Sequence, residues 1–197
     1  MLHRISESIA VFLFDKSDKY PIDIYIYGIE LMISSLIGTI IILFLGLVLN
    51  VIIESIIFMV SLSLIRLFCG GYHAKTYFKC NLIFVISFVF ALFVAKKAIF
   101  FISLYYYYTL MGLFLLSFII FLKFSPVDNE NKRVPVEKMK TYKVISILIL
   151  VVELSVTLLL PLLNINQIII ILPTILVVDI AIITEKIISS VKKNNFK

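Results

Sequence analysis

Residues 66–81 contain both cysteines of the chain and one of its two histidines. Within this segment, His73 and Cys80 are seven residues apart, which would place them two turns apart on one helix face if the chain is helical between them. A thiol is mostly protonated at neutral pH, so a nucleophilic cysteine benefits from a nearby imidazole that takes its proton. The pair is therefore compatible with a cysteine peptidase, in which the sulfur attacks a peptide carbonyl and forms an acyl-thioester, although a lone cysteine and histidine in a membrane protein more often serve packing.

Other residues of the same segment can support this chemistry. Gly70 and Gly71 can end the preceding helix and let the backbone approach another chain closely, and N–H groups near them are candidate oxyanion donors. Arg66 can anchor at lipid headgroups, bind a substrate carboxylate or brace the turn. Cys69 competes with Cys80 for the role of nucleophile, and their spacing alone does not decide between them.

Three other classes of function fit parts of the sequence. A metal site could use Cys69, His73 and Cys80, but their spacing fits no familiar zinc motif, so we expect no metal and no other cofactor. A non-enzymatic scaffold would use the same side chains only for packing. An ion- or proton-coupled transporter could use acids within apolar runs, although such acids also form structural contacts between helices. These acids are Glu54, Glu153 and Asp179.

The composition places these residues in a membrane protein. Of the 197 residues, 62% are hydrophobic and 15% are charged, which is more apolar surface than a soluble core of this size can bury. A lipid bilayer must therefore surround much of the chain. The net charge of +6 comes from cations that flank apolar runs, so we expect no nucleic-acid partner. Both cysteines fall on the reducing side of the predicted topology, which argues against a structural disulfide.

The long apolar runs predict an all-α fold, a polytopic integral membrane protein with about six transmembrane helices and an amphipathic N-terminal helix. Each crossing needs roughly 20 helical residues. We place the spans at residues 22–49, 51–68, 82–95, 99–122, 144–160 and 168–188. Asn50 and residues 161–167 are predicted turns, Lys96 and Lys97 are predicted to break the run after the third span, and residues 123–143 are predicted to form a cytoplasmic loop. Residues 1–197 read as a single domain.

Residues 1–20 are predicted to lie along the membrane surface. Ile5, Ile9, Phe12 and Leu13 recur at helical spacing, with polar residues between them. The apolar stretch is too short for a cleaved signal peptide and has no small-residue cleavage site, so we keep it in the mature protein. Lysine and arginine fall almost entirely on one side of the alternating spans, which predicts a multi-pass protein of the cell membrane with both termini in the cytoplasm.

Arg66, the run from Gly70 to Lys75, and Cys80 together resemble the signature of the AgrB family, the accessory gene regulator membrane peptidases that process quorum-sensing pro-peptides. Residues 126–132 are similar to the polar-loop motif of that family, and the length and spacing of the spans agree over nearly the whole chain. The resemblance implies that His73 is the catalytic histidine and Cys80 the nucleophile. It places Arg66, Gly70 and Gly71 on motif positions and leaves Cys69 outside them.

The resemblance also implies a substrate and an assembly. The substrate would be an AgrD-like pro-peptide whose charged C-terminal tail is removed, and the acyl-enzyme would be captured by a side chain of the same peptide to give a thiolactone or lactone ring. A homodimer in the bilayer is also implied. No Asp or Glu lies beside His73 in the sequence, so the residue that orients its imidazole is not identified.

Overall fold

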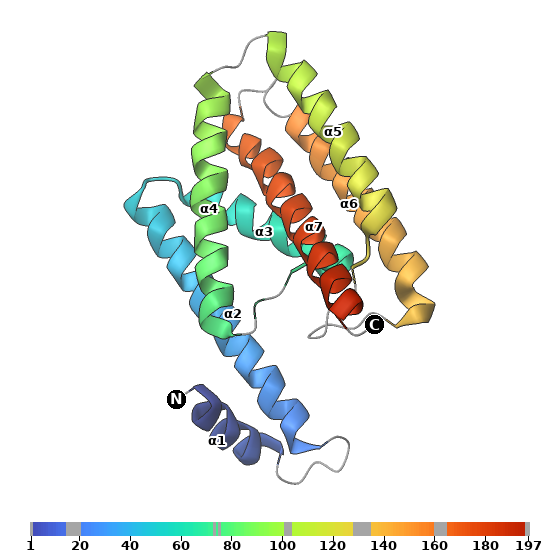
Figure 1. Cartoon of the computed structure of the whole chain (residues 1–197). Coiled ribbons are helices and arrows are strands. Elements are labelled where there is room, and N and C mark those ends of the chain that lie inside the picture. The colour runs from blue at the N-terminus through green and yellow to red at the C-terminus, as the bar shows by residue number, and fades with distance from the viewer. Residues whose placement is uncertain are drawn as a thin grey trace.

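The computed structural model describes residues 2–14, 21–72, 74, 76–100, 104–127, 135–159 and 165–195. Within them the protein is all-helical, as predicted (Figure 1). The α-helices are α1 (Leu2–Phe14), α2 (Ile22–Val48), α3 (Ile52–Cys69), α4 (Tyr77–Phe100), α5 (Leu104–Phe124), α6 (Met139–Leu159) and α7 (Ile171–Asn195). Two short 3₁₀ helices, η1 (Val136–Lys138) and η3 (Asn166–Ile170), precede α6 and α7.

Five of these helices, α2, α3, α4, α6 and α7, are long and apolar enough to cross a bilayer. In α5, the apolar stretch with described side chains is shorter and covers Met111–Phe124. The protein is therefore a polytopic membrane protein, and each predicted span coincides with one helix from α2 to α7. Figure 1 shows α4 to α7 running in alternating directions, with the N- and C-terminal ends toward the same end of the bundle.

The structure corrects two boundaries near the middle of the chain. α4 begins at Tyr77 rather than at residue 82, so Cys80 belongs to the first turn of the helix. Lys96 and Lys97 do not break the run, because α4 continues through them to Phe100. Lys97 Nζ lies 5.8 Å from the centroid of the Phe93 ring, one turn earlier on the same helix. A lysine can remain in such a helix because its long aliphatic stem tolerates apolar surroundings.

The predicted loop at residues 123–143 is also shorter than expected. At one end, α5 continues to Phe124. At the other end, η1 begins at Val136 and leads directly into α6. The turn expected at Asn50 is present between α2 and α3, and Asn50 adopts a positive φ of 54° there.

Helix α1 packs beside the first turns of α2 and keeps an apolar face exposed. Ser6 and Ala10 are buried against α2, and the ring of Phe14 stacks on that of Tyr25 at 4.2 Å. On the opposite side Phe12 is 87% exposed, together with Ile5 and Leu13. The predicted amphipathic helix is confirmed, and its exposed apolar face is of the kind that enters a membrane interface.

The main hydrophobic core lies among the helices α2 to α7, with α7 the most buried of the candidate spans. Phe58 of α3 and Phe88 of α4 are fully buried, and their rings lie 5.3 Å apart. Ile65 and Cys69 extend this buried stripe to the last residue of α3. The core therefore fixes the end of α3, from which the glycine pair continues.

Candidate functional site

The glycine pair forms a turn that only glycine adopts without strain. α3 ends at Cys69, Gly70 follows with φ 75° and ψ −141°, and Gly71 has φ 117°. Side chains with a Cβ rarely adopt such positive φ values. A Cβ at Gly70 would also overlap the carbonyl oxygen of Val127. The backbone does make a close approach here, but to another segment of the same chain, and the predicted approach to another chain stays a prediction.

This glycine turn, residues 70–72, is attached to the bundle on two sides. On one side, the Val127 N–H donates to the Cys69 carbonyl oxygen at 2.8 Å, and Gly70 forms an isolated parallel bridge with Val127. On the other side, the Tyr72 N–H donates to the Ala181 carbonyl oxygen of α7 at 3.1 Å. Val127 belongs to the polar-loop motif seen in the sequence, so the two motifs meet at this turn.

Arg66 braces the same turn from within α3. Its Nη2 donates to the Tyr72 carbonyl oxygen at 2.5 Å. Its Nε is buried and has no acceptor among the described residues. Of the roles considered from the sequence, bracing of the turn is the one for which the structure shows a contact.

The two cysteines occupy different environments, and neither is in a disulfide. The Cys69 side chain is fully buried in the core, and its Sγ donates to the Gly70 carbonyl oxygen at 3.3 Å. Cys80 is half-buried in the first turn of α4, where its N–H donates to the Thr76 carbonyl oxygen at 3.0 Å. Thr76 also caps the helix, since its Oγ1 accepts from the Lys79 N–H at 3.3 Å. Of the two thiols, Cys80 is the more accessible.

The start of α4 is fastened to α2 by polar contacts that were not predicted from the sequence. The Tyr77 hydroxyl donates to Glu30 Oε2 at 2.8 Å, and His3 Nδ1 of α1 lies 2.7 Å from Glu30 Oε1. One turn further along both helices, Asn81 Nδ2 donates to Ser34 Oγ at 3.4 Å. Cys80 lies between these two contacts in the sequence, so they fix the turn that carries it. The available signal was Glu30 itself, an acid within an apolar run.

Several predicted residues lie outside the described part of the chain. His73 is one of them, so the structure leaves its distance from Cys80 untested. Lys75 and residues 128–132 of the polar-loop motif are others. Gly70, Gly71, Tyr72, Ala74 and Thr76 are described and are not helical. The two-turn helical relationship considered for His73 and Cys80 is therefore wrong, because the helix begins only at Tyr77.

The buried acids of the bundle make contacts between helices. Ser61 of α3 donates to Glu153 Oε2 of α6 at 2.8 Å. Ser117 of α5 donates to Asp179 Oδ2 of α7 at 2.6 Å. Glu54 is half-buried in the first turn of α3, where a negative charge is favourable to the helix dipole. For Glu153 and Asp179, the structural contact anticipated from the sequence is confirmed.

Comparisons with known proteins agree with these motifs. A family model described as Accessory gene regulator B matches residues 6–184 of the chain. AgrB-like protein 2 of Clostridium perfringens strain 13 is 31% identical over 140 residues, which cover 67% of this chain but only 65% of that relative's length. An AgrB-like protein of Clostridium perfringens strain SM101 is 31% identical over 163 residues, covering 78% of this chain and 75% of that protein. No solved structure matches. Because the family match covers most of the sequence, including the glycine turn and Cys80, the chain belongs to the AgrB family.

Proposed function

We propose that this protein is a membrane cysteine peptidase that removes the C-terminal tail of an AgrD-like pro-peptide, with Cys80 as the nucleophile and His73 as the general base. Membership of the AgrB family supports the substrate class. The observation that carries the choice of nucleophile is accessibility, because Cys80 is half-buried whereas Cys69 is fully buried in the core. The position of Cys80 in the first turn of α4 also supports this role, since helix N-termini favour anions and a nucleophilic cysteine is an anion.

In the proposed reaction, His73 takes the proton of the Cys80 thiol, and Sγ attacks the carbonyl carbon of the scissile bond. The carbon–nitrogen bond then breaks, and the proton passes from the imidazole to the leaving amine. The resulting acyl-thioester keeps the acyl group activated. A side-chain thiol or hydroxyl of the same peptide then attacks that acyl carbon while His73 takes its proton. The bond to Cys80 Sγ breaks, the proton passes to the released sulfur, and a thiolactone or lactone ring closes.

We assign supporting roles to the glycine turn and to Arg66. The Gly70 N–H already donates to the Arg66 carbonyl oxygen at 3.3 Å, as the last contact of α3. We therefore propose the Gly71 N–H as the donor that stabilises the oxyanion of the tetrahedral intermediate. Arg66 holds the turn in place through the Tyr72 carbonyl oxygen.

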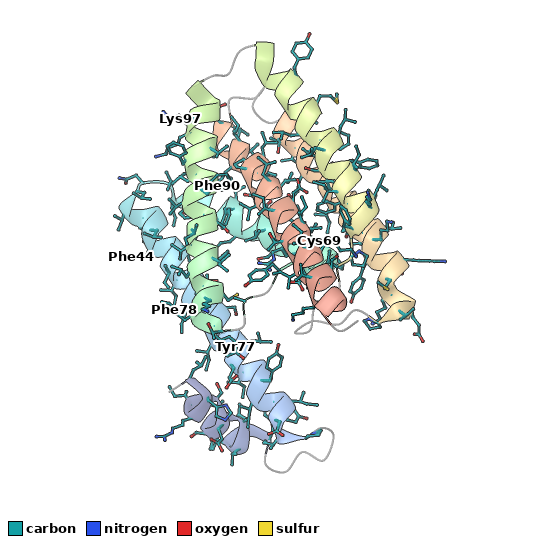
Figure 2. All side chains as sticks on the ribbon, in the orientation of Figure 1. Phe44, Cys69, Tyr77, Phe78, Phe90 and Lys97 are labelled. Atoms are coloured by element: carbon teal, nitrogen blue, oxygen red, sulfur yellow. The ribbon has the colours of Figure 1, made fainter. Side chains whose placement is uncertain are left out.

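The proposed orientation places both termini and residues 66–81, which we call the reactive segment, on the cytoplasmic side. It is supported by the cations, since Lys96 and Lys97 are the only lysines or arginines on the opposite side of the alternating spans. Figure 2 shows Tyr77 and Phe78 at one end of α4 and Lys97 at the other. By resemblance to the family, we also propose that the protein acts as a homodimer.

Co-expression with an AgrD-like pro-peptide, followed by mass analysis of the released tail, tests the proposal. Cys80→Ala and His73→Ala should each abolish cleavage, because one removes the nucleophile and the other the base. Cys69→Ala is the matched control and should retain most of the activity. A peptide bound covalently to Cys80, released by hydroxylamine, would identify the acyl-enzyme. Cleavage by folded Cys80→Ala, or its loss in folded Cys69→Ala, would show that the nucleophile is wrong.

A further inference from the structure

An apolar crevice opens among α3, α4 and α7, beside the reactive segment. Its volume is ≈ 400 Å³, which is within the range of about 300–1,000 Å³ typical of ligand pockets. Ile83 and Ser87 of α4 form one wall and Ile180 of α7 forms another, while Arg66 and Tyr72 close one end. Because Ile180 is 57% exposed, the crevice is open at the side of the bundle.

The crevice continues the helix face that carries the proposed nucleophile. Cys80, Ile83 and Ser87 follow one another at spacings of three and four residues, so they lie on one face of α4. At 1.5 Å per residue, Ser87 is roughly 10 Å along the helix axis from Cys80. About three extended peptide residues cover that length. A peptide whose scissile carbonyl lies at Cys80 can therefore place its neighbouring residues in the crevice.

The polar end of the crevice offers one hydrogen bond that the described residues do not use. Arg66 Nη2 is engaged with the Tyr72 carbonyl oxygen, whereas Arg66 Nε is buried without an acceptor among the described residues. A buried donor without an acceptor is unfavourable. A phospholipid carries its carbonyl acceptors only at the ester end of each acyl chain, whereas a peptide supplies apolar side chains and carbonyl oxygens together at every residue. The crevice therefore fits a peptide better than an acyl chain.

We propose that this crevice binds the apolar residues of the pro-peptide that directly precede the scissile bond, with one of their carbonyl oxygens accepting from Arg66 Nε. This inference rests on the proposed peptidase function. It adds the place where the peptidase would distinguish one substrate sequence from another. Apolar side chains between α4 and α7 would also keep water away from the acyl-thioester, so that attack from within the peptide competes with hydrolysis.

The test uses two thiol-reactive peptide probes on the full-length protein in phospholipid nanodiscs. Acetyl-Leu-Leu chloromethyl ketone and acetyl-Gly-Gly chloromethyl ketone alkylate cysteine with loss of chloride, and peptide mass mapping gives the rate at Cys80. We expect the leucine probe to react at least about tenfold faster than the glycine probe, as apolar pockets discriminate by such factors. Ser87→Phe and Ile180→Phe fill the crevice from opposite walls and should each bring the ratio of the two rates close to one.

Val89→Phe is the matched control, since Val89 is on α4, is 49% exposed and does not line the crevice. It should keep the wild-type ratio. A wild-type ratio of one, or an unchanged ratio in both folded crevice variants, would overturn the proposal. Retention of a phospholipid by the wild type but not by Ser87→Phe, together with a ratio of one, would assign the crevice to lipid. If pro-peptide cleavage still requires Cys80 in any of these cases, the proposed function stands and only the crevice assignment fails.

Discussion

Replacement of Gly70 by alanine should disable the protein while leaving its helices formed. The added Cβ meets two obstacles, namely the backbone conformation and the carbonyl oxygen of Val127. A residue other than glycine in this conformation costs on the order of 1–3 kcal/mol. Displacement of Val127 also breaks its hydrogen bond to the Cys69 carbonyl oxygen, worth about 1 kcal/mol. The expected loss is about 2–4 kcal/mol, concentrated at the turn.

Two other glycines separate these contributions. Gly71 has a positive φ, but a Cβ there would meet Ala181 only at an ordinary 3.5 Å, so Gly71→Ala should show the conformational cost alone. Gly112 of α5 has nothing within 4 Å of a built Cβ, and Gly112→Ala should be neutral or stabilise the helix by about 0.5–1 kcal/mol. From the most to the least stable variant, the expected order is therefore Gly112→Ala, Gly71→Ala and Gly70→Ala.

The assay combines pro-peptide cleavage with unfolding in detergent micelles monitored by circular dichroism. Because a displacement of about 1 Å at a reactive centre can cost about 10²-fold in rate, Gly70→Ala should lose cleavage to roughly that extent while keeping its helical signal. Gly112→Ala should cleave at the wild-type rate. Equal stability and activity of Gly70→Ala and Gly112→Ala would refute the reasoning, since the turn would then tolerate a side chain.

Three further substitutions test contacts elsewhere in the bundle. Glu30→Ala should slow cleavage and speed protease attack near Tyr77, because the α2 anchor of α4 is lost, whereas Glu30→Gln retains an acceptor and should behave like the wild type. Glu153→Gln should retain cleavage and stability, since Ser61 can donate to the amide oxygen; proton-coupled uptake that is lost in this variant would instead support a transporter. Phe12→Asp should weaken binding of an isolated residue 1–20 peptide to lipid vesicles by about tenfold or more in a flotation assay, because Phe12 is on the exposed apolar face of α1.

The sequence predicted the number and order of the helices because each crossing requires a long apolar run, and this requirement is local. It misplaced the start of α4 because Lys79 and Asn81 interrupt the apolar pattern there. In the fold, Thr76 caps this end and Asn81 contacts Ser34 on α2, so the helix begins earlier. The break predicted at Lys97 was wrong for a related reason, since hydropathy counts the charge of a lysine but not its aliphatic stem.

The partners of the reactive segment were harder to predict because they come from distant parts of the chain. Gly70 was expected to approach another chain closely, and nothing local in the sequence identifies Val127 of the same chain as its neighbour. The bridge from His3 through Glu30 to Tyr77 joins three helices, and none of these residues belongs to the family signature in the sequence. Polar contacts between helices depend on which faces meet, and a single sequence does not give that pairing.

The glycine turn and the thiol are carried by different parts of the bundle. The Tyr72 N–H of the glycine turn is hydrogen-bonded to the Ala181 carbonyl oxygen of α7. The first turn of α4, which carries Cys80, is fastened to α2 through Tyr77 and Asn81. A change in the packing of α4 against α7 would therefore alter how Gly71, the proposed oxyanion donor, faces Cys80, the proposed nucleophile. The crevice lies at this boundary, since both helices line it. A peptide bound there as we propose would contact both parts at once, so the binding energy of the apolar residues that precede the scissile bond would be available to hold the glycine turn and Cys80 in their relative positions.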